Sequence, residues 1–269
     1  MTPSDNSPQD DRRRVLAHLA IHPGSTPEVI SRACLGGRSN SAVDSFMRRM
    51  MTPAMTPALV ATQPLYARRR GYRLTIAGAR MTGAPREAAR PLGPQARVNR
   101  MAVAWHLYAP GSKRRLVPPG ELRTVFRIDA HRLPRRHFYL DELGTGARLG
   151  YLVVDHGAQV RRVVRKTTDT LARFLKLGWF DDLIAQGRFQ VTVLTPTAGK
   201  QRAIRLHLGP YVESVLGPML KRFRGAGADP IRLEVVVVDE LDQLVIDAWR
   251  AADHRRSEAK KPDQEGPSP

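Results

Sequence analysis

The fold of the N-terminal part is decided by residues 25–51, which read STPEVISRACLGGRSNSAVDSFMRRMM. Residues 25–28 are a helix start, because a hydroxyl residue caps the helix, proline suits its first turn and glutamate occupies the capping-box position. Gly36-Gly37 end this helix, since glycine accepts the backbone conformation found after a helix C-terminus. Ser39 or Asn40 then caps a second helix that runs to the end of the stretch, so the segment predicts helix, turn, helix.

The flanking segments extend this pattern in both directions. Residues 11–21 have apolar side chains at helical spacing and predict a preceding helix. Residues 59–63 and 71–75 predict two strands, with the basic triplet Arg68-Arg69-Arg70 between them. Three helices followed by a hairpin with a basic tip predict a winged helix-turn-helix over residues 11–81.

The third helix and the hairpin tip carry the residues that we expect to contact DNA. Small polar side chains at the start of the helix let its N-terminus approach base edges and phosphates, whereas later arginines reach phosphates. A basic hairpin tip lies along the backbone or enters the minor groove. The expected contacts are Arg38, Ser39, Asn40, Ser41, Ser45, Arg48 and Arg49 in the helix and Arg68, Arg69 and Arg70 in the hairpin. Such binding requires no cofactor.

The charge of the chain supports a polyanionic partner. Its 44 Lys and Arg against 25 Asp and Glu give a net charge of +19, and residues 1–100 alone hold 16 Arg, no Lys and six acidic residues, a net +10. No apolar run approaches the roughly 18 residues of a membrane span, so nucleic acid is a better partner than a membrane. The single cysteine, Cys34, fits a reducing cytosol, and we expect a cytoplasmic, nucleoid-associated protein, with a homodimer left open.

The second half alternates strands and helices. Residues 82–94 predict a linker, 95–253 an α/β domain with a mixed sheet, and both chain ends, 1–10 and 254–269, disorder. The expected strands are 122–128, 137–141, 148–155, 189–195 and 231–239. The expected helices are 95–107, 158–177, 199–208, 211–223 and 241–252.

This order fits a restriction-endonuclease-like αβββαβ core, so a metal-dependent nuclease is one candidate function. Such chemistry needs acids at strand ends to hold Mg²⁺ and a lysine to polarise water or phosphate. Asp129 follows the first expected strand and Asp155 ends the third, so these two are the candidate metal ligands and catalytic acids. Lys166, in the following helix, is the candidate catalytic lysine.

The chain resembles the replication-relaxation family of bacterial plasmids and other mobile elements. Residues 74–78, LTIAG, match the Leu-Thr-x-x-Gly-like segment that ends the winged helix in that family, and Ile128-Asp129-Ala130 resembles its Pro-Asp-Ala. Residues 153–157, VVDHG, stand where the family has Glu-x-Asp-x-Gly before a helix carrying a lysine, here Lys166. The resemblance spans roughly residues 12–195 and implies a winged helix joined to a nuclease-like domain, with replication or transfer proteins as partners.

The departures from that pattern leave three functions open. Valine at position 153, where the family has glutamate, cannot bind a metal or carry a proton, so the catalytic set is incomplete. The leading expectation is a DNA-binding protein of a mobile element, acting in replication, transfer or its regulation, with an inactive nuclease-like domain. The alternatives are a Mg²⁺-dependent DNA endonuclease and an assembly adaptor for which DNA contact is secondary.

Overall fold

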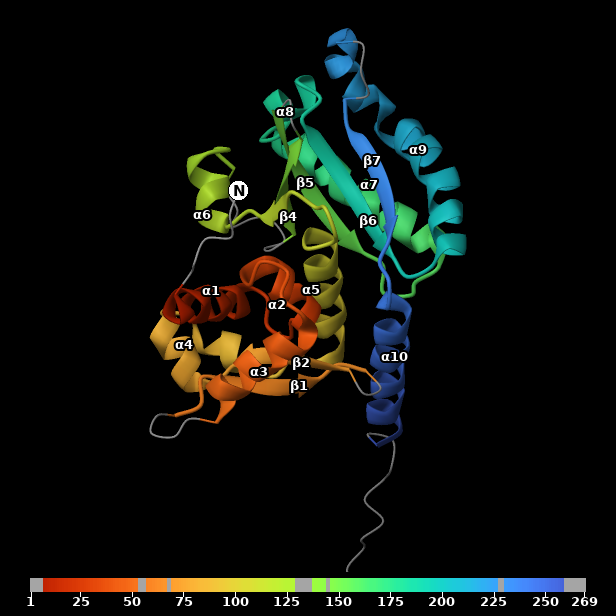
Figure 1. The fold of residues 1–269 in the computed structure, drawn as a ribbon. Coiled ribbons are helices and arrows are strands. Elements are labelled where there is room, and N and C mark those ends of the chain that lie inside the picture. Colours follow the sequence, from red (N-terminus) through yellow and green to blue (C-terminus); the bar gives the residue numbers. More distant parts are fainter. Residues whose placement is uncertain are drawn as a thin grey trace, which may run out of the picture. The chain divides into compact units, whose positions relative to one another are not determined.

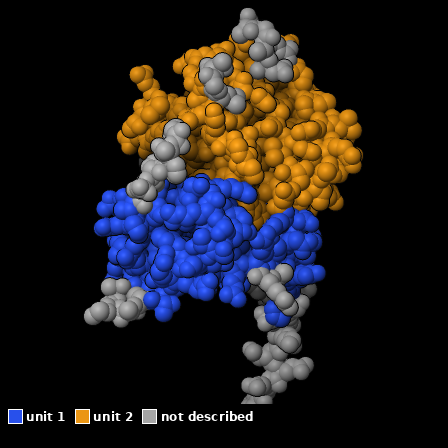
Figure 2. Space-filling view, in the orientation of Figure 1, with its two compact units in different colours: residues 1–101, 240–269 blue, residues 102–239 orange. Residues whose placement is uncertain are grey.

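The chain has a mixed α+β architecture that divides into two compact units. The computed structural model describes residues 7–52, 57–66, 69–128, 137–143, 146–226 and 230–258 (Figure 1). Unit 1 comprises Met1–Met101 together with Glu240–Pro269, and unit 2 comprises Ala102–Asp239 (Figure 2). The boundary between them falls inside one helix, α5.

Unit 1 is mainly helical and contains one two-stranded hairpin. Its elements are α1 (Pro8–Ile21), α2 (Pro27–Cys34), α3 (Asn40–Met51), β1 (Val60–Pro64), β2 (Arg70–Leu74), α4 (Ile76–Thr82), the 3₁₀ turn η1 (Arg86–Ala89), the first half of α5 (Pro94–Leu107) and α10 (Leu241–Glu258). Strands β1 and β2 are antiparallel. The order of helices and strands agrees with the sequence expectation.

The apolar faces of α1, α2 and α3 make the core of unit 1. Val15, Leu19, Val43 and Met47 have no exposed surface and pack in one cluster with side chains of both strands. A hydroxyl caps α3: the Ser39 hydroxyl accepts a hydrogen bond from the backbone N–H of the third residue after it, at 3.4 Å. Helix α2 has no such cap, because the Ser25 hydroxyl donates to the His22 carbonyl at 2.8 Å. The spacing of apolar residues in the sequence therefore produced the helix faces that are buried.

The hairpin is held against the loop between α1 and α2. Tyr72 of β2 forms an antiparallel bridge with Ser25, donating its backbone N–H to the Ser25 carbonyl at 2.9 Å and accepting one from Gly24 at 2.7 Å. At Gly71 an added Cβ would lie 2.0 Å from the Gly24 carbonyl oxygen. Only glycine permits this close approach, so the sequence Gly71-Tyr72 fixes where the hairpin sits.

Three segments of unit 1 differ from the sequence expectation. Residues 82–94 are not a linker, because Ala88 and Ala89 are buried in the unit 1 core and Gln63 of β1 exchanges two hydrogen bonds of 3.2 Å with the backbone of Leu92. The small residues that suggested flexibility instead allow close packing. At the chain ends, residues 8–10 and 254–258, expected to be disordered, are helical.

Unit 2 is built on a five-stranded sheet of order β3-β4-β5-β6-β7. The strands are β3 (Arg114–Leu116), β4 (Phe138–Leu143), β5 (Gly146–Val154), β6 (Phe189–Thr195) and β7 (Arg232–Val237). β3, β4 and β5 pair antiparallel, while β5, β6 and β7 are parallel. The helical elements are α6 (Pro119–Thr124), α7 (Val160–Leu177), α8 (Asp181–Ala185), α9 (Ala198–Leu220) and the 3₁₀ turn η3 (Lys221–Ala226).

The two faces of this sheet have different chemistry. One face packs under α7 and α9 and contains the aromatic rings of Phe138, Tyr151 and Phe189, which meet Phe174 of α7. The alternate residues point to the other face, as the pleat requires. There the Tyr139 hydroxyl is hydrogen-bonded to Thr192 at 2.8 Å. A mixed sheet covered by helices agrees with the expected mixed α/β character of this half.

The expected strand over residues 122–128 is wrong. A helix, α6, begins at Pro119, which suits a first helical turn, and Val125 is 65% exposed where a buried strand residue was expected. The first strand is instead β3, which sequence reasoning missed because it is rich in arginine. Arg114 forms an ion pair of 3.1 Å with Asp141 on the neighbouring strand, which compensates for its charge.

Two further differences concern the C-terminal helices. The helices expected at 199–208 and 211–223 are one helix, α9, with Pro210 inside it. Pro210 has no N–H to donate to the Leu206 carbonyl, and both residues are exposed, so this carbonyl lies on the solvent side of the helix. The last helix, α10, which we expected in the α/β domain, belongs to unit 1.

Candidate nucleic-acid interface

The expected helix contacts all lie on the exposed face of α3 or in the two residues before it. Arg38, Ser39, Asn40, Ser41, Ser45, Arg48 and Arg49 are exposed, while Val43, Phe46, Met47 and Met50 are buried. The helix thus separates a small polar and cationic side from an apolar one. Tyr72 of the hairpin donates its hydroxyl to Asp44 at 2.6 Å, which joins α3 to β2. Burial first, and then the hydrogen bond to Asp44, raise the pKa of Tyr72, so this donor stays protonated.

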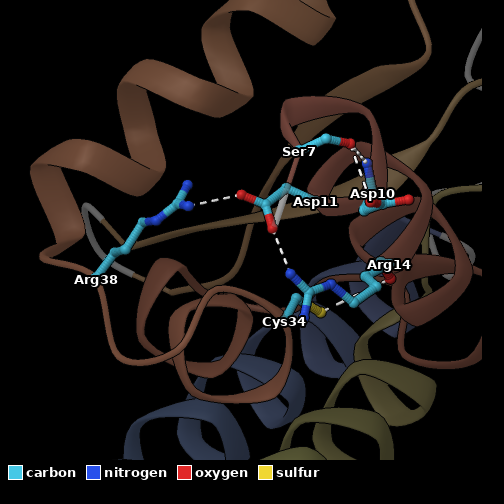
Figure 3. Close-up of polar contacts among 6 residues, drawn as sticks. All are labelled: Ser7, Asp10, Asp11, Arg14, Cys34 and Arg38. Carbon is cyan, nitrogen blue, oxygen red and sulfur yellow. Dashed lines mark hydrogen bonds and ion pairs between the residues drawn. The ribbon is translucent and has the colours of Figure 1, made fainter. Parts of the chain in front are cut away.

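Arg38, just before α3, is paired with a buried acid that it shares with Arg14. Its guanidinium lies 2.7 Å from Asp11, whose side chain is 2% exposed, and Arg14 contacts the same carboxylate at 2.5 Å. Figure 3 shows Arg38 and Arg14 on opposite sides of Asp11. The Arg38 carbonyl also accepts a hydrogen bond of 2.5 Å from the Ser31 hydroxyl. Arg38 is therefore anchored in unit 1 and is a weaker phosphate ligand than its exposure suggests.

Glu28 of α2 brings the start of α3 and the hairpin together. Its carboxylate accepts a hydrogen bond of 3.1 Å from the Asn40 amide and forms an ion pair of 2.8 Å with Arg69. Arg69 also pairs with Glu240, the residue before α10. Partial burial raises the pKa of Glu28, but hydrogen bonds from its own backbone, Thr26 and Arg69, with the charge of Arg69, outweigh this and lower the pKa. Glu28 therefore stays ionised and holds both partners.

The remaining arginines of the expected interface have a different environment. Within the described part of the chain, Arg48, Arg49 and Arg70 have no carboxylate within ion-pair distance. Arg48 donates to the Asp44 carbonyl at 3.4 Å, and the Arg49 guanidinium lies 5.8 Å from the Phe46 ring. Arg68 lies outside the described residues. Arg48, Arg49 and Arg70 thus keep charges that an anionic ligand can reach.

The sequence did not reveal the acids that pair with two of these arginines, Arg38 and Arg69. Asp11, Glu28 and Glu240 are far from their arginine partners in the sequence, and Asp11 belongs to a segment that reads only as a helix start. The available signal is that a buried carboxylate needs a cationic partner. Applied to the apolar face of α1, this rule marks Asp11 as a residue that binds an arginine.

Arg12 and Arg13 lie on the other side of α1 and line a groove. Its volume is about 780 Å³, and it lies between α1 and the end of α4 with the segment after it. Leu16, Ala17 and Met81 supply apolar lining. The two arginines add positive charge to unit 1 without joining the contacts around α3.

Asp155, the expected metal ligand of unit 2, does not fit a Mg²⁺ site. Its side chain has no exposed surface, and one carboxylate oxygen accepts the backbone N–H groups of Gly157 and Ala158 at 3.0 and 3.1 Å. The other oxygen accepts the Thr195 hydroxyl at 3.3 Å and lies 2.8 Å from the Lys200 ammonium. A lysine therefore occupies the place that a cation would need, and the carboxylate instead fixes the β5–α7 loop against α9.

The rest of the expected nuclease set is not brought together. Asp129 lies outside the described residues, so no metal geometry is assigned to it. Lys166 is exposed on α7 and is close enough to His156 that its charge contributes to lowering the pKa of that imidazole to about 4, although burial is the larger cause. Across the described ranges, no group of three His, Cys, Asp or Glu residues is arranged to hold a metal ion.

Comparisons of the chain with models of protein families, with curated proteins and with solved structures gave no match. The resemblance to the replication-relaxation family therefore stays a prediction from short motifs. None of the helices in the described residues has the length and apolar character needed to cross a membrane.

Proposed function

We propose that the chain is a DNA-binding protein in which unit 1 is a winged helix-turn-helix. In this proposal α3 is the recognition helix and the β1–β2 hairpin is the wing. The observation that carries it is the exposed small polar and cationic side of α3, tied to the hairpin through Tyr72–Asp44 and through Glu28, which binds both Asn40 and Arg69. These contacts hold two DNA-facing elements in one arrangement before DNA binds, which lowers the entropic cost of binding.

The side chains along α3 divide into two roles. Ser41 and Ser45 are exposed, short and able to donate or accept hydrogen bonds, so they suit contact with base edges in the major groove. Arg48, Arg49 and, on the hairpin, Arg70 suit contact with phosphates, which fixes orientation and supplies salt-dependent affinity. Arg38 and Arg69 act mainly within unit 1, because acids already neutralise them.

We further propose that the protein serves a plasmid or other mobile element in replication, transfer or their regulation, as a cytoplasmic, nucleoid-associated protein. The resemblance of short motifs to the replication-relaxation family supports this role. For unit 2 we propose a nuclease-like domain kept for binding or assembly. The saturated carboxylate of Asp155 and valine at position 153 argue against Mg²⁺-dependent hydrolysis, so no nuclease step is proposed.

Selection of duplexes from a random pool by the full-length protein tests the function. We expect the protein to enrich one motif, and Ser41→Ala with Ser45→Ala to change that motif while affinity for random DNA stays within about twofold. Arg48→Ala with Arg49→Ala should weaken binding to every duplex and reduce the slope of log K against log salt by about 0.9 for each phosphate that the variant no longer neutralises.

Arg80→Ala with Arg86→Ala is the matched control, because these exposed arginines of α4 and η1 carry the same charge but lie outside α3 and the hairpin. The control should bind like the unaltered protein. If the α3 pair and the control pair weaken binding equally, or if no motif is enriched, α3 is not a recognition helix.

A further inference from the structure

Helix α7 of unit 2 presents an unusually basic outer face. Its exposed residues on this side, which we call the basic face of α7, are Arg161, Arg162, Arg165, Lys166, Asp169, Arg173 and Lys176. Six cations and one acid give this face a net charge of +5. Arg165 and Asp169 are 3.8 Å apart, but both side chains are more than two-thirds exposed, so the pair neutralises little of the charge.

The charges of the basic face destabilise α7 as an isolated helix. Arg161 and Arg165, and likewise Arg162 and Lys166, are like charges four residues apart, and each such pair disfavours a helix by about 0.2–0.5 kcal/mol. Arg161 and Arg162 also occupy the first turn, where the helix dipole favours acids and where α7 has none. A bound polyanion removes both penalties, because it neutralises the repelling charges and provides the negative charge that the N-terminus prefers.

The other 18-residue helix, α10, shows that this pattern is not general in the chain. Its charged side chains are of both signs, with Asp242, Asp247, Arg250 and Asp253 along the helix. A helix face that only needs to be solvated is served by such a mixture. The basic face of α7, with six cations and one acid, therefore differs in charge from α10.

We propose that the basic face of α7 is a second DNA-binding surface that contacts the phosphate backbone of a duplex. Its exposed residues include no apolar side chain that could insert into a membrane. They include no aromatic ring for stacking the bases of a single strand either, since Phe174 is buried. From Arg161 to Lys176 the helix rises about 22 Å, a length along which duplex DNA presents about a dozen charges.

This surface lacks the features of a base reader. Long cations suit phosphates, whereas α7 offers no exposed serine or asparagine of the kind found at the start of α3. The surface therefore contributes affinity without sequence preference. It lies in unit 2 and does not rest on the function proposed for unit 1.

Two variants of the full-length protein, each with three substitutions, test the inference. Arg161→Gln, Arg162→Gln and Lys166→Gln remove three charges from the basic face. Arg123→Gln, Lys221→Gln and Arg232→Gln remove three exposed charges elsewhere in unit 2 and serve as the control. Binding of both variants to a 30-base-pair duplex is measured from 50 to 300 mM salt, and circular dichroism checks the helix content.

The α7 triple should bind every duplex at least about tenfold more weakly at the lowest salt and reduce the salt slope by about 2 to 3, with the selected motif unchanged. The control should reduce the slope by less than about 1. Equal losses in both triples would overturn the inference, because only net charge would matter. If the α7 triple variant binds the duplex as tightly as the unaltered protein, the inference is also overturned. A loss of binding to phosphatidylserine vesicles in the same variant would then indicate a membrane surface as the partner of this face.

The two proposals fail separately. If the α3 variants leave the motif and affinity unchanged while the α7 triple weakens duplex binding, the inference stands without the winged-helix function. If the α3 variants act as expected and the α7 triple matches its control, the function stands without the inference. Because glutamine is a good helix former and the substitutions relieve like-charge repulsion, we expect the α7 triple to keep its helix content and melting temperature.

Discussion

Helices α3 and α7 are both exposed and basic, but their side chains differ in kind. The outer side of α3 begins with small hydroxyl and amide residues and places Arg48 and Arg49 later, whereas the basic face of α7 is almost entirely long cations. The surroundings differ as well. Acids of other elements hold the residues at the start of α3, while Asp169, on the same helix, is the acid on the α7 face.

Under the two proposals, this difference divides specificity and affinity between two helices of one chain. Short side chains with fixed positions can distinguish base edges, because a misplaced hydrogen bond is costly. Flexible cations on a uniform face tolerate any sequence, because phosphates repeat along every duplex. We therefore expect variants of α3 and α7 to change different properties of the same binding curve.

The largest expected effect comes from combining the two surfaces. Arg48→Glu with Arg49→Glu, and separately Arg161→Glu with Lys166→Glu, should each weaken duplex binding by about tenfold to a hundredfold, and the four together by about the product. Fluorescence anisotropy at 100 mM salt measures these losses. If the quadruple variant binds no more weakly than one of the two double variants, the two helices do not contact DNA independently.

Acid should destabilise the unit that carries α3. His18 and His22 of α1 and its following loop are buried with ring centroids 4.9 Å apart, and burial is the main cause that lowers their pKa values from 6.5 to about 4 and about 3. The unfolded chain therefore binds more protons below pH 6.5, so stability is full above that pH and falls by up to about 1.4 kcal/mol per pH unit for each histidine towards pH 4.

Melting temperature measured from pH 7.5 to 4 checks this expectation. His18→Gln keeps a group able to bond to the Ser25 hydroxyl, which lies 2.9 Å from the His18 ring nitrogen, but removes one titrating site. This variant should have a shallower pH dependence. An unchanged slope would mean that His18 is not a source of the acid sensitivity.

Releasing Arg38 from Asp11 tests whether this ion pair limits the contact of Arg38 with DNA. Asp11→Asn removes the charge that Arg38 and Arg14 share, and both arginines are then solvated because their side chains are nearly half exposed. We expect a loss of about 1–2 kcal/mol in unfolding free energy, as for a hydrogen-bonded charge, and a several-fold gain in affinity for random DNA. Denaturant titration and anisotropy measure the two quantities. Weaker DNA binding would show that Arg38 must stay anchored to function.

The smallest expected effect separates two neighbouring arginines of the hairpin. Arg69 is paired with Glu28 and Glu240, whereas Arg70 is exposed, so Arg70→Gln should weaken duplex binding by about two- to fivefold and Arg69→Gln by less. The two variants are matched in charge and differ by one position. A larger loss for Arg69→Gln would indicate that Arg69 leaves its acids to contact phosphate.

Most local structure followed from the sequence because its causes are local. The start and end signals around residues 25–51 placed α2 and α3, and the strand expected at 189–195 has the same bounds as β6, Phe189 and Thr195. The segments that were misread depend on distant partners. β3 is a strand because Asp141 and Glu142 compensate its arginines, and residues 86–89 are packed because alanines fit a core that the local pattern does not show.

By itself the sequence determined the helix-turn-helix-hairpin order, the strong positive charge and the polar side of α3, since caps, glycines and apolar spacing act within a few residues. Only the tertiary structure decided which charges remain available. Asp11, Glu28 and Glu240 neutralise Arg38 and Arg69, and Lys200 closes the site expected at Asp155. The physical reason is that ion pairs act over a few ångströms in space between residues remote in the chain, whereas sequence spacing records neither their distance nor their burial.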